Sequence, residues 1–475
     1  MFRKREWVLL AGLLIAYNIN LRQVSSHDTY ASRFVPISIL RDGDMVLDEF
    51  VPEETKRHAG ENSLSDNFVY VRGHFYDSHA PIGPLLALPV YALPAWIGIP
   101  RNSELVANLF SKLAASMMVA LSALAIFYAS RRVLLACRSD AGSREQDPAY
   151  IDRVAMFAAV TYGLATPVWS TASLAMWTHT PAVLGFAVAL WALTAGRTGL
   201  AGVAAAAACF ARPATAPALA FLGLFLLHRM WRDGWRATGT GSRADVMWFA
   251  AGGALAGLSG ILYNYWLFEN FVGGAPFRTE IWLREFGTRD MFAGSLPAGF
   301  AGLTVSPSRG VLIYSPIVLV ACYGALSAWK SRAGDDAVLL LRYVSLAAIA
   351  ILLTYSKFIV WWGGHGYGPR YLTDAMPFVG ILFAPGLLPI AAQGARTRLA
   401  RIAVTTVFVY SVFIQAVGAF CWPESWTLNQ NPPYRYRLWD WRESQIESCL
   451  KDGPRIDPAA KRLFRFVGFV GSFGS

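Results

Sequence analysis

Residues 107–131 have the sequence ANLFSKLAASMMVALSALAIFYASR, and the run ends at a pair of arginines, Arg131 and Arg132. A transmembrane helix needs about 20 consecutive residues that are mainly apolar. The run is long enough for one crossing. We therefore expect a membrane-spanning helix that ends at basic residues on one side of the membrane.

Ten further apolar runs resemble this one, which gives an expectation of about 11 transmembrane helices. The runs 199–211 and 214–228 are each shorter than a full crossing, and they could instead be half-length helices that meet at Arg212 and Pro213. The ten runs are Trp7 to about Ile19 and residues 151–169, 180–195, 199–211, 214–228, 246–267, 311–329, 337–358, 376–392 and 400–420.

The basic residues predict the orientation of these spans, because cytoplasmic loops of membrane proteins are rich in Lys and Arg. Arg3-Lys4-Arg5 precedes the first span as it would in a signal peptide, but no small-residue cleavage site follows. We expect an uncleaved span with a cytoplasmic N-terminus. Strict alternation then places five more clusters on the cytoplasmic side: Arg131/Arg132, Arg197, Arg229/Arg232/Arg236, Lys330/Arg332 and Arg396/Arg398/Arg401.

One apolar run, residues 82–99, is not counted as a span. It follows Pro81 and contains Pro84, Pro89 and Pro94, and prolines remove helix hydrogen bonds that lipid cannot replace. Counting it would also move every later basic cluster to the outer side. We expect an interfacial or re-entrant segment within a long first external loop, about residues 24–106. The transmembrane domain is then 1–420, and residues 421–475 form an external tail.

The composition agrees with a membrane protein and excludes other classes. The 475 residues are 55% apolar and 15% charged, whereas soluble domains carry about 25% charged residues. A cytosolic enzyme and a disordered protein are excluded. The net charge of +11 is divided among short clusters between apolar runs, so no nucleic-acid-binding patch is expected. Five cysteines are too few for a disulfide scaffold, but Cys421 and Cys449 could pair in the external tail.

The polar motifs of the chain gather in the external segments. Ionisable groups at a membrane boundary are functional candidates, because removing them from water costs free energy. The motifs occupy residues 26–33, 73–81, 177–181, 306–310 and 361–374.

These motifs resemble those of the GT-C class of integral membrane glycosyltransferases, which use polyprenyl-phosphate sugars as donors. An acidic residue follows the first span (Asp28), and more specific motifs are similar to those of bacterial arabinosyl- or mannosyltransferase-like members. A lysine is common in that family where this chain has His79. The matching motifs are His27-Asp28-Thr29, residues 77–83, residues 307–316, residues 368–374 and Trp439-Asp440-Trp441.

The resemblance implies an all-α, polytopic bundle in the bacterial inner membrane with a periplasmic active site. Asp28 would be the general base, and Asp77 is the second catalytic candidate, although it could equally cap the helix after Pro81. Candidates for the donor phosphate are Arg370, Arg309, Lys357, His79, His179 and Tyr367. Trp177, Trp361 and Trp362 could contact a sugar or the acceptor, or form an aromatic belt.

No cofactor is expected. Histidines together with Asp28 or Asp77 could hold a divalent metal, but no short His-x-x-His spacing supports this alternative. The expected partners are the lipid-linked donor, membrane lipids and an extracytoplasmic glycan, lipid or protein acceptor.

The sequence thus predicts an inverting transfer of one sugar from a polyprenyl phosphate to that acceptor. Two alternatives stay open. One is a transporter or flippase of a lipid-linked or anionic solute, although no internal repeat is present and the polar motifs lie at span ends. The other is a ligase or oligosaccharyltransferase that moves a whole glycan from a lipid pyrophosphate.

Overall fold

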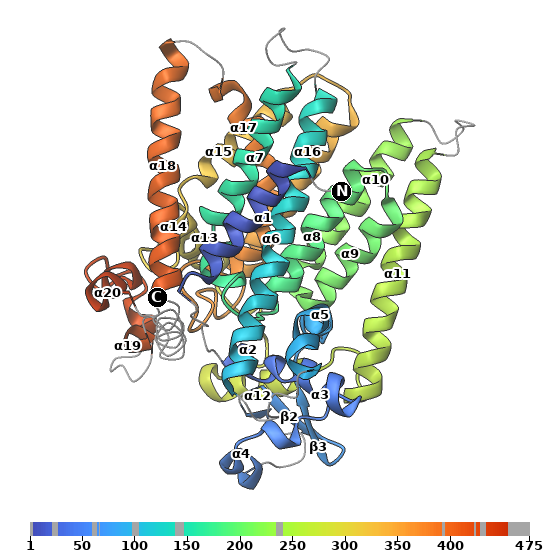
Figure 1. The fold of residues 1–475 in the computed structure, drawn as a ribbon, viewed down its shortest axis with the longest axis vertical. Coiled ribbons are helices and arrows are strands. Elements are labelled where there is room, and N and C mark those ends of the chain that lie inside the picture. Colours follow the sequence, from blue (N-terminus) through green and yellow to red (C-terminus); the bar gives the residue numbers. More distant parts are fainter. Residues whose placement is uncertain are drawn as a thin grey trace, which may run out of the picture.

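The computed structural model describes residues 3–20, 27–58, 64–65, 67–96, 104–137, 147–233, 241–391, 395–421, 424–427 and 434–454. The chain is mainly α-helical, and its long helices lie side by side in one bundle (Figure 1). Each of the predicted spans falls on a helix. These helices are α1 (Lys4–Asn18), α6 (Glu104–Ala136), α7 (Pro148–Leu164), α8 (His179–Thr194), α9 (Thr198–Ala211), α10 (Ala216–Arg232), α11 (Gly241–Phe268), α15 (Val318–Lys330), α16 (Asp336–Ser356), α17 (Met376–Ala391) and α18 (Ala395–Phe420).

Within the described ranges, six helices are long and apolar enough to cross a membrane: α6, α10, α11, α16, α17 and α18. Helix α9 has 14 residues. At 1.5 Å per residue it is about 21 Å long, shorter than a hydrocarbon core of about 30 Å. It meets α10 at Arg212 and the 3₁₀ turn η5 (Pro213–Thr215), the junction that the sequence indicated.

Two predicted spans are interrupted, which corrects their expected bounds. Residues 151–169 do not form one helix, because α7 ends at Leu164 and a π-helical turn, η4 (Val168–Ala172), follows Pro167. Residues 311–329 are divided into α14 (Val311–Tyr314) and α15. Pro316 lacks a backbone N–H and disfavours helical backbone at the residue before it, so the chain breaks there. The preceding apolar helix α13 (Leu296–Val305) is an element that the sequence did not predict.

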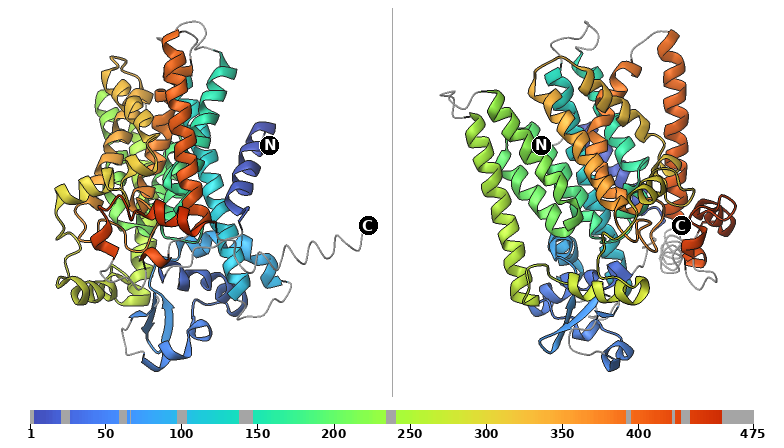
Figure 2. Two further views of the ribbon diagram at one scale, coloured as in Figure 1. Left: turned by 90° about the vertical axis from the view of Figure 1, so that its left-hand side faces the viewer. Right: turned by 180° about the vertical axis from the view of Figure 1, so that it is seen from behind.

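The segment predicted to be the first external loop also departs from a purely helical fold. It contains an antiparallel sheet in the order β1-β2-β3, with Phe68 paired to Asp77 and Val71 to His74. The views in Figure 2 place this small domain at one end of the bundle. Its elements are α2 (His27–Tyr30), η1 (Ala31–Arg33), α3 (Val35–Asp42), η2 (Asp48–Phe50), α4 (Glu53–His58), β1 (Leu64–Ser65), β2 (Phe68–Val71) and β3 (His74–Asp77).

The proline-rich run forms a helix, α5 (Ile82–Trp96), which lies between the bundle and the sheet (Figure 1). A Cβ atom at Gly83 would lie 3.6 Å from the Pro181 ring, so the start of α5 packs on the start of α8. The small domain is thereby held close to the end of the bundle at which α8 begins.

The opposite end of the bundle gathers basic residues with a few carboxylates. Arg5 and Arg131 both contact Asp152, with Arg131 Nε 2.5 Å from the carboxylate. Arg229 and Arg232 both pair with Asp336. These contacts join the start of α1 to the end of α6 and the end of α10 to the start of α16, as the predicted alternation of spans requires.

The described part of the C-terminal tail packs against α18. It contains α19 (Glu424–Thr427), η7 (Tyr434–Arg437) and α20 (Gln445–Asp452). The expected Cys421–Cys449 disulfide is wrong in this structure. The Cys449 thiol instead donates a hydrogen bond to the Cys421 carbonyl oxygen at 3.4 Å, and both residues are buried.

Helices α9 and α11 approach each other through glycines. A Cβ at Gly202 would lie 2.0 Å from the Phe249 carbonyl oxygen, and one at Gly252 would lie 2.1 Å from that of Gly199. Small residues allow such close backbone contact between membrane helices, where packing rather than hydrophobic burial drives association.

We predict that Gly202→Ala lowers the free energy of unfolding by about 1–3 kcal/mol, because the added methyl group must push the two backbones apart. The matched control is Gly257→Ala in α11, since no atom lies within 4 Å of a Cβ there. Denaturant titration of the purified protein measures both variants. Equal stability of the two variants would contradict the close α9–α11 contact.

Candidate active site

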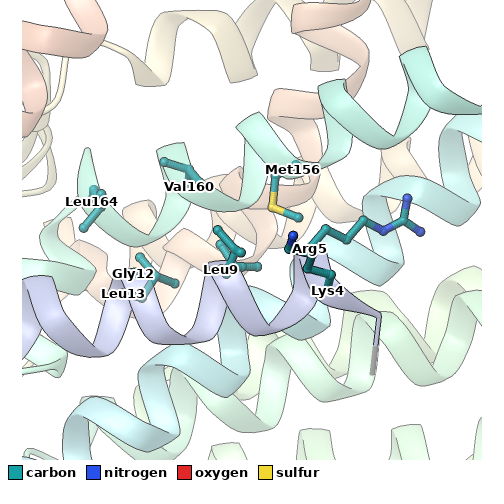
Figure 3. A pocket seen from close by; sticks show the side chains of 9 residues that line it. Lys4, Arg5, Leu9, Gly12, Leu13, Met156, Val160 and Leu164 are labelled. Atoms are coloured by element: carbon teal, nitrogen blue, oxygen red, sulfur yellow. The ribbon is translucent and has the colours of Figure 1, made fainter. Parts of the chain in front are cut away.

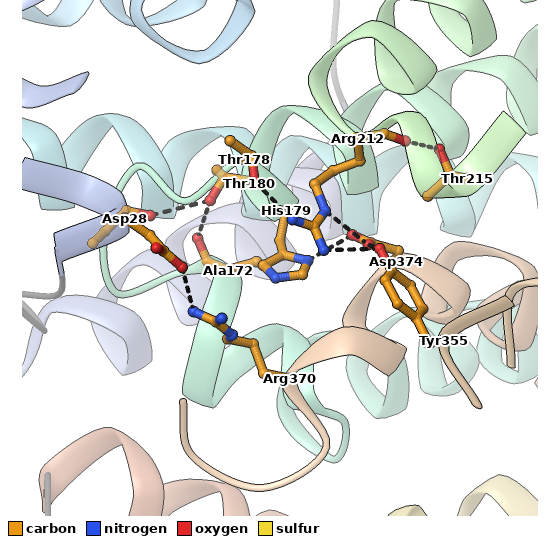
Figure 4. Close-up of polar contacts among 11 residues, drawn as sticks. Asp28, Ala172, Thr178, His179, Thr180, Arg212, Thr215, Tyr355, Arg370 and Asp374 are labelled. Carbon is orange, nitrogen blue, oxygen red and sulfur yellow. Dashed lines mark hydrogen bonds and ion pairs between the residues drawn. The ribbon is translucent and has the colours of Figure 1, made fainter. Parts of the chain in front are cut away.

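Several segments far apart in sequence meet at the end of the bundle near the small domain. They are helix α2, the turn before α8, the junction between α9 and α10, and the 3₁₀ helix η6 (Arg370–Ala375) before α17. Four residues predicted from the sequence lie in this group: Asp28, Trp177, His179 and Arg370. Figure 4 shows the polar contacts that connect these segments.

Asp28 and Arg370 form the ion pair at the centre of this group. Arg370 donates to Asp28 through a nitrogen 2.7 Å from the carboxylate oxygen. The Arg370 side chain is only 8% exposed, whereas that of Asp28 is 43% exposed. The carboxylate can therefore be reached from outside while the guanidinium is held by the protein.

The surroundings of Arg370 fix its position. The Trp177 ring lies under the guanidinium, 4.7 Å from its carbon, in cation–π geometry. A Cβ at Gly366 would lie 2.5 Å from the Arg370 side chain, so only glycine allows the loop to fold over it. Gly363 and Gly364 adopt left-handed backbone conformations, with φ values of 73° and 62°.

A second cluster surrounds Asp374. One carboxylate oxygen lies 2.7 Å from His179 Nδ1, and the other accepts from Arg212 Nε at 3.2 Å and from the Tyr355 hydroxyl. Arg212 also donates to the Tyr355 oxygen at 2.8 Å and to Thr178 at 3.3 Å. The Asp374 side chain has no exposed surface.

The arrangement determines the proton position on His179. An ionised Asp374 can only accept, so the nearby Nδ1 carries a proton and donates it. Nε2 has no hydrogen-bond partner among the described residues. Figure 4 shows the ring between the Asp28–Arg370 pair and the Arg212–Asp374 pair. Burial disfavours the charge of Arg212, but Tyr355 and Asp374 raise the pKa of its guanidinium above the ordinary value, so it stays charged.

Asp77 and His79 lie in a separate, closed position at the end of β3. His79 Nδ1 is 3.1 Å from Asp77 Oδ1, and both side chains are buried. The second oxygen, Asp77 Oδ2, has no hydrogen-bond partner within the described ranges. The cavity between these residues, Tyr76 and Tyr263 holds about 10 Å³, which fits one water molecule at most and no sugar.

Arg309 and Tyr367 have contacts that organise the loop around Arg370. Arg309 is fully buried and donates to Gln445 and, at 3.0 Å, to the Gly364 carbonyl oxygen. Gln445 in turn accepts from the Gly368 amide at 2.9 Å. The Tyr367 hydroxyl donates to the Ile414 carbonyl oxygen, and its ring is buried in the bundle.

The remaining candidates precede this loop in the sequence. Lys357 is exposed and donates to the Gly294 carbonyl oxygen at 2.9 Å. Trp361 and Trp362 contact each other edge to face, and Trp361 also lies near Trp439 of the tail. In the described part of the chain, no group of three or more His, Cys, Asp or Glu residues could hold a metal ion.

Sequence reasoning did not select Arg212, Tyr355 and Asp374 as site residues. The sequence nevertheless contains two features that point to Asp374 and Arg212. Asp374 ends the motif that begins with Gly368, and Arg212 is a charge between two short apolar runs at their expected outer ends. A carboxylate and an arginine that alternation assigns to the same membrane face are natural partners.

No protein-family model and no curated protein matches the chain. Solved structures give weak similarities. ArnT from Cupriavidus metallidurans bound to undecaprenyl phosphate has 14% identity and a TM-score of 0.44, with 88% of this chain and 76% of that chain covered. Its apo structure has 15% identity and a TM-score of 0.41, covering 87% and 74%.

The apo oligosaccharyltransferase of Archaeoglobus fulgidus is similar at 12% identity and a TM-score of 0.48. The match covers 95% of this chain but only 61% of that protein. These three TM-scores are below 0.5, so the similarities carry no argument about what this chain does.

We predict that Asp374→Ala lowers the free energy of unfolding by about 3 kcal/mol, because it leaves the Arg212 charge without its carboxylate. The double variant Arg212→Met, Asp374→Leu should recover most of this loss, since it removes both charges and keeps the volume. Denaturant titration in detergent measures both. If Asp374→Ala were as stable as the wild type, the stability of the cluster would not depend on the Arg212–Asp374 ion pair.

Proposed function

We propose that this protein is a membrane glycosyltransferase. It moves one sugar from a polyprenyl-phosphate donor to a hydroxyl acceptor at the outer face of the membrane, with inversion at the anomeric carbon. The observation that carries the proposal is the 2.7 Å pair of a half-exposed carboxylate, Asp28, and a buried guanidinium, Arg370. Asp28 would supply a proton acceptor and Arg370 an anion-binding group. Both lie at the end of a bundle of apolar helices.

Arg370 would bind the donor phosphate. A guanidinium presents a planar fork of donors that matches phosphate oxygens, and its low exposure strengthens the contact. The phosphate competes with Asp28 for this fork, so donor binding releases the carboxylate. A carboxylate without a cationic partner accepts a proton more readily. The base would thus be activated only when the donor is bound.

The transfer then follows with balanced bonds. The acceptor hydroxyl oxygen attacks the anomeric carbon from the side opposite the phosphate. The bond between that carbon and the phosphate oxygen breaks, and its electron pair leaves with the polyprenyl phosphate. The hydroxyl proton passes to Asp28. Arg370 stabilises the negative charge on the departing phosphate.

A second catalytic carboxylic acid is not required by this chemistry. A phosphate leaving group carries its own negative charge, so it needs no proton to depart, unlike the sugar oxygen that glycosidases expel. This agrees with the position of Asp77 beside a cavity of about 10 Å³, which is too small for a sugar. We assign base catalysis to Asp28, and to Asp77 and His79 a role in holding the β3–α5 connection.

His179 and Trp177 would complete the donor site. Trp177 supports Arg370 from one face, and Asp374 orients the His179 ring so that Nε2 can accept a hydrogen bond from a sugar hydroxyl. Arg212 and Tyr355 hold Asp374 and do not need to touch the substrate.

We predict that Asp28→Asn reduces the transfer rate by about 10²–10⁴-fold, the usual contribution of a general base, because the amide keeps the shape but takes no proton. Transfer of radiolabelled sugar from a polyprenyl-phosphate donor by purified protein measures the rate. Asp77→Asn is the matched control and should stay within a few-fold of wild type. A larger loss in Asp77→Asn than in Asp28→Asn would move the base to Asp77.

We predict that Arg370→Ala weakens donor use by about 1.5–3 kcal/mol, which is about 10- to 150-fold in kcat/KM, while the protein still folds. Arg370→Lys should recover only part of the loss, because a point charge replaces the planar fork. Steady-state kinetics with varied donor tests both variants. Unchanged kinetics would make Arg370 structural, and solute flux in proteoliposomes without any transfer would favour a transporter.

A further inference from the structure

A groove between α1 and α7 has no part in the site described above. Figure 3 shows the side chains that line it along the two helices. Its volume is about 600 Å³, and it is open along one side. The apolar lining residues are Val8, Leu9, Gly12, Leu13, Met156, Val160 and Leu164, and Lys4 and Arg5 complete the set.

The groove exists because the two helices touch at both ends and separate between them. At one end Arg5 contacts Asp152. At the other the Tyr17 hydroxyl donates to the Gly163 carbonyl oxygen at 2.9 Å, where a Cβ at Gly163 would collide with Tyr17. Between these points Gly12 contributes no side chain, and no atom lies within 4 Å of where its Cβ would be.

The charges lie at one end only. Lys4 is exposed and lines the groove at the first turn of α1. Arg153 is exposed and lies three residues before Met156, so it is on the same face of α7 as Met156 and Val160. Two carboxylates are present at this mouth, since Asp152 contacts Arg5 and Arg131 and Glu6 also lies 3.7 Å from Arg5. The basic residues Lys4, Arg5, Arg131 and Arg153 outnumber them, which leaves an excess of positive charge.

We propose that this groove binds one anionic phospholipid, with an acyl chain along Gly12 and its headgroup phosphate at Lys4 and Arg153. An acyl chain matches the apolar walls, and basic residues at the ends of membrane helices attract anionic headgroups. The Tyr17–Gly163 contact closes the end of the groove that is nearer the candidate active site. The basic residues lie at the other end, which the sequence predicts to be cytoplasmic. The site is therefore distinct from the donor site and does not depend on the proposed function.

Native mass spectrometry of the full-length protein, with equal amounts of dioleoyl phosphatidylglycerol and dioleoyl phosphatidylcholine, tests this proposal. We expect one phosphatidylglycerol to be retained preferentially by the wild type. Gly12→Leu fills the groove from its floor and should remove most of this retention. Gly257→Leu in α11, where the space around the Cβ is equally open, is the matched control and should retain the lipid.

Lys4→Gln and Arg153→Gln test the headgroup contact without filling the groove. Each should lower the preference for phosphatidylglycerol over phosphatidylcholine by about fivefold, the effect of one basic residue near an anionic lipid. Equal retention of the two lipids by wild type, or unchanged retention in Gly12→Leu, would overturn the proposal. Preferential retention of an added polyprenyl phosphate in the same groove would overturn it as well.

Discussion

The ion pair between Asp28 and Arg370 is the interaction on which the candidate site depends. It joins the short helix α2 to the start of η6, which precedes α17, and the two residues are 342 positions apart in the sequence. Near a membrane boundary each charge needs a partner, because water cannot fully solvate it. The pair lets the two side chains neutralise each other, and in the proposed function an incoming phosphate replaces Asp28 at Arg370.

The rest of the outer end holds this pair in place. Glycines of the 363–368 loop allow the backbone to fold around Arg370, and Trp177 supports the guanidinium. Gln445 of the tail bonds to that loop at Gly366 and Gly368, so the tail contributes to the same site. Asp374 connects His179 of α8 to Arg212 at the α9–α10 junction. Helices and loops from several parts of the chain thus contact one small group of charged residues.

The helices could be predicted because apolar runs of membrane length have few alternatives to a helix, and the shared contacts of Arg5 and Arg131 with Asp152 agree with the predicted alternation. Helix breaks near Pro167 and Pro316 divide two of the predicted spans, so their helices have other bounds than predicted. The sheet at residues 64–77 was missed because its strands have at most four residues and show no clear period.

The candidate site could be predicted only in part. Asp28, Trp177, His179 and Arg370 stand in polar motifs that are visible in the sequence. Arg212 and Asp374 are 162 residues apart, and only the packing of the bundle brings them into contact. The closed cavity at Asp77 is also a property of packing, since the sequence alone made Asp77 as good a catalytic candidate as a helix cap.

The central claim is that phosphate and Asp28 compete for Arg370. The affinity of a short-chain polyprenyl phosphate for wild type and for Asp28→Asn, measured by isothermal titration calorimetry at one ionic strength, tests it most directly. The account predicts that Asp28→Asn binds the phosphate about fivefold more tightly, because an ion pair worth about 1 kcal/mol no longer has to be broken. Equal or weaker binding by a folded Asp28→Asn protein would contradict the account.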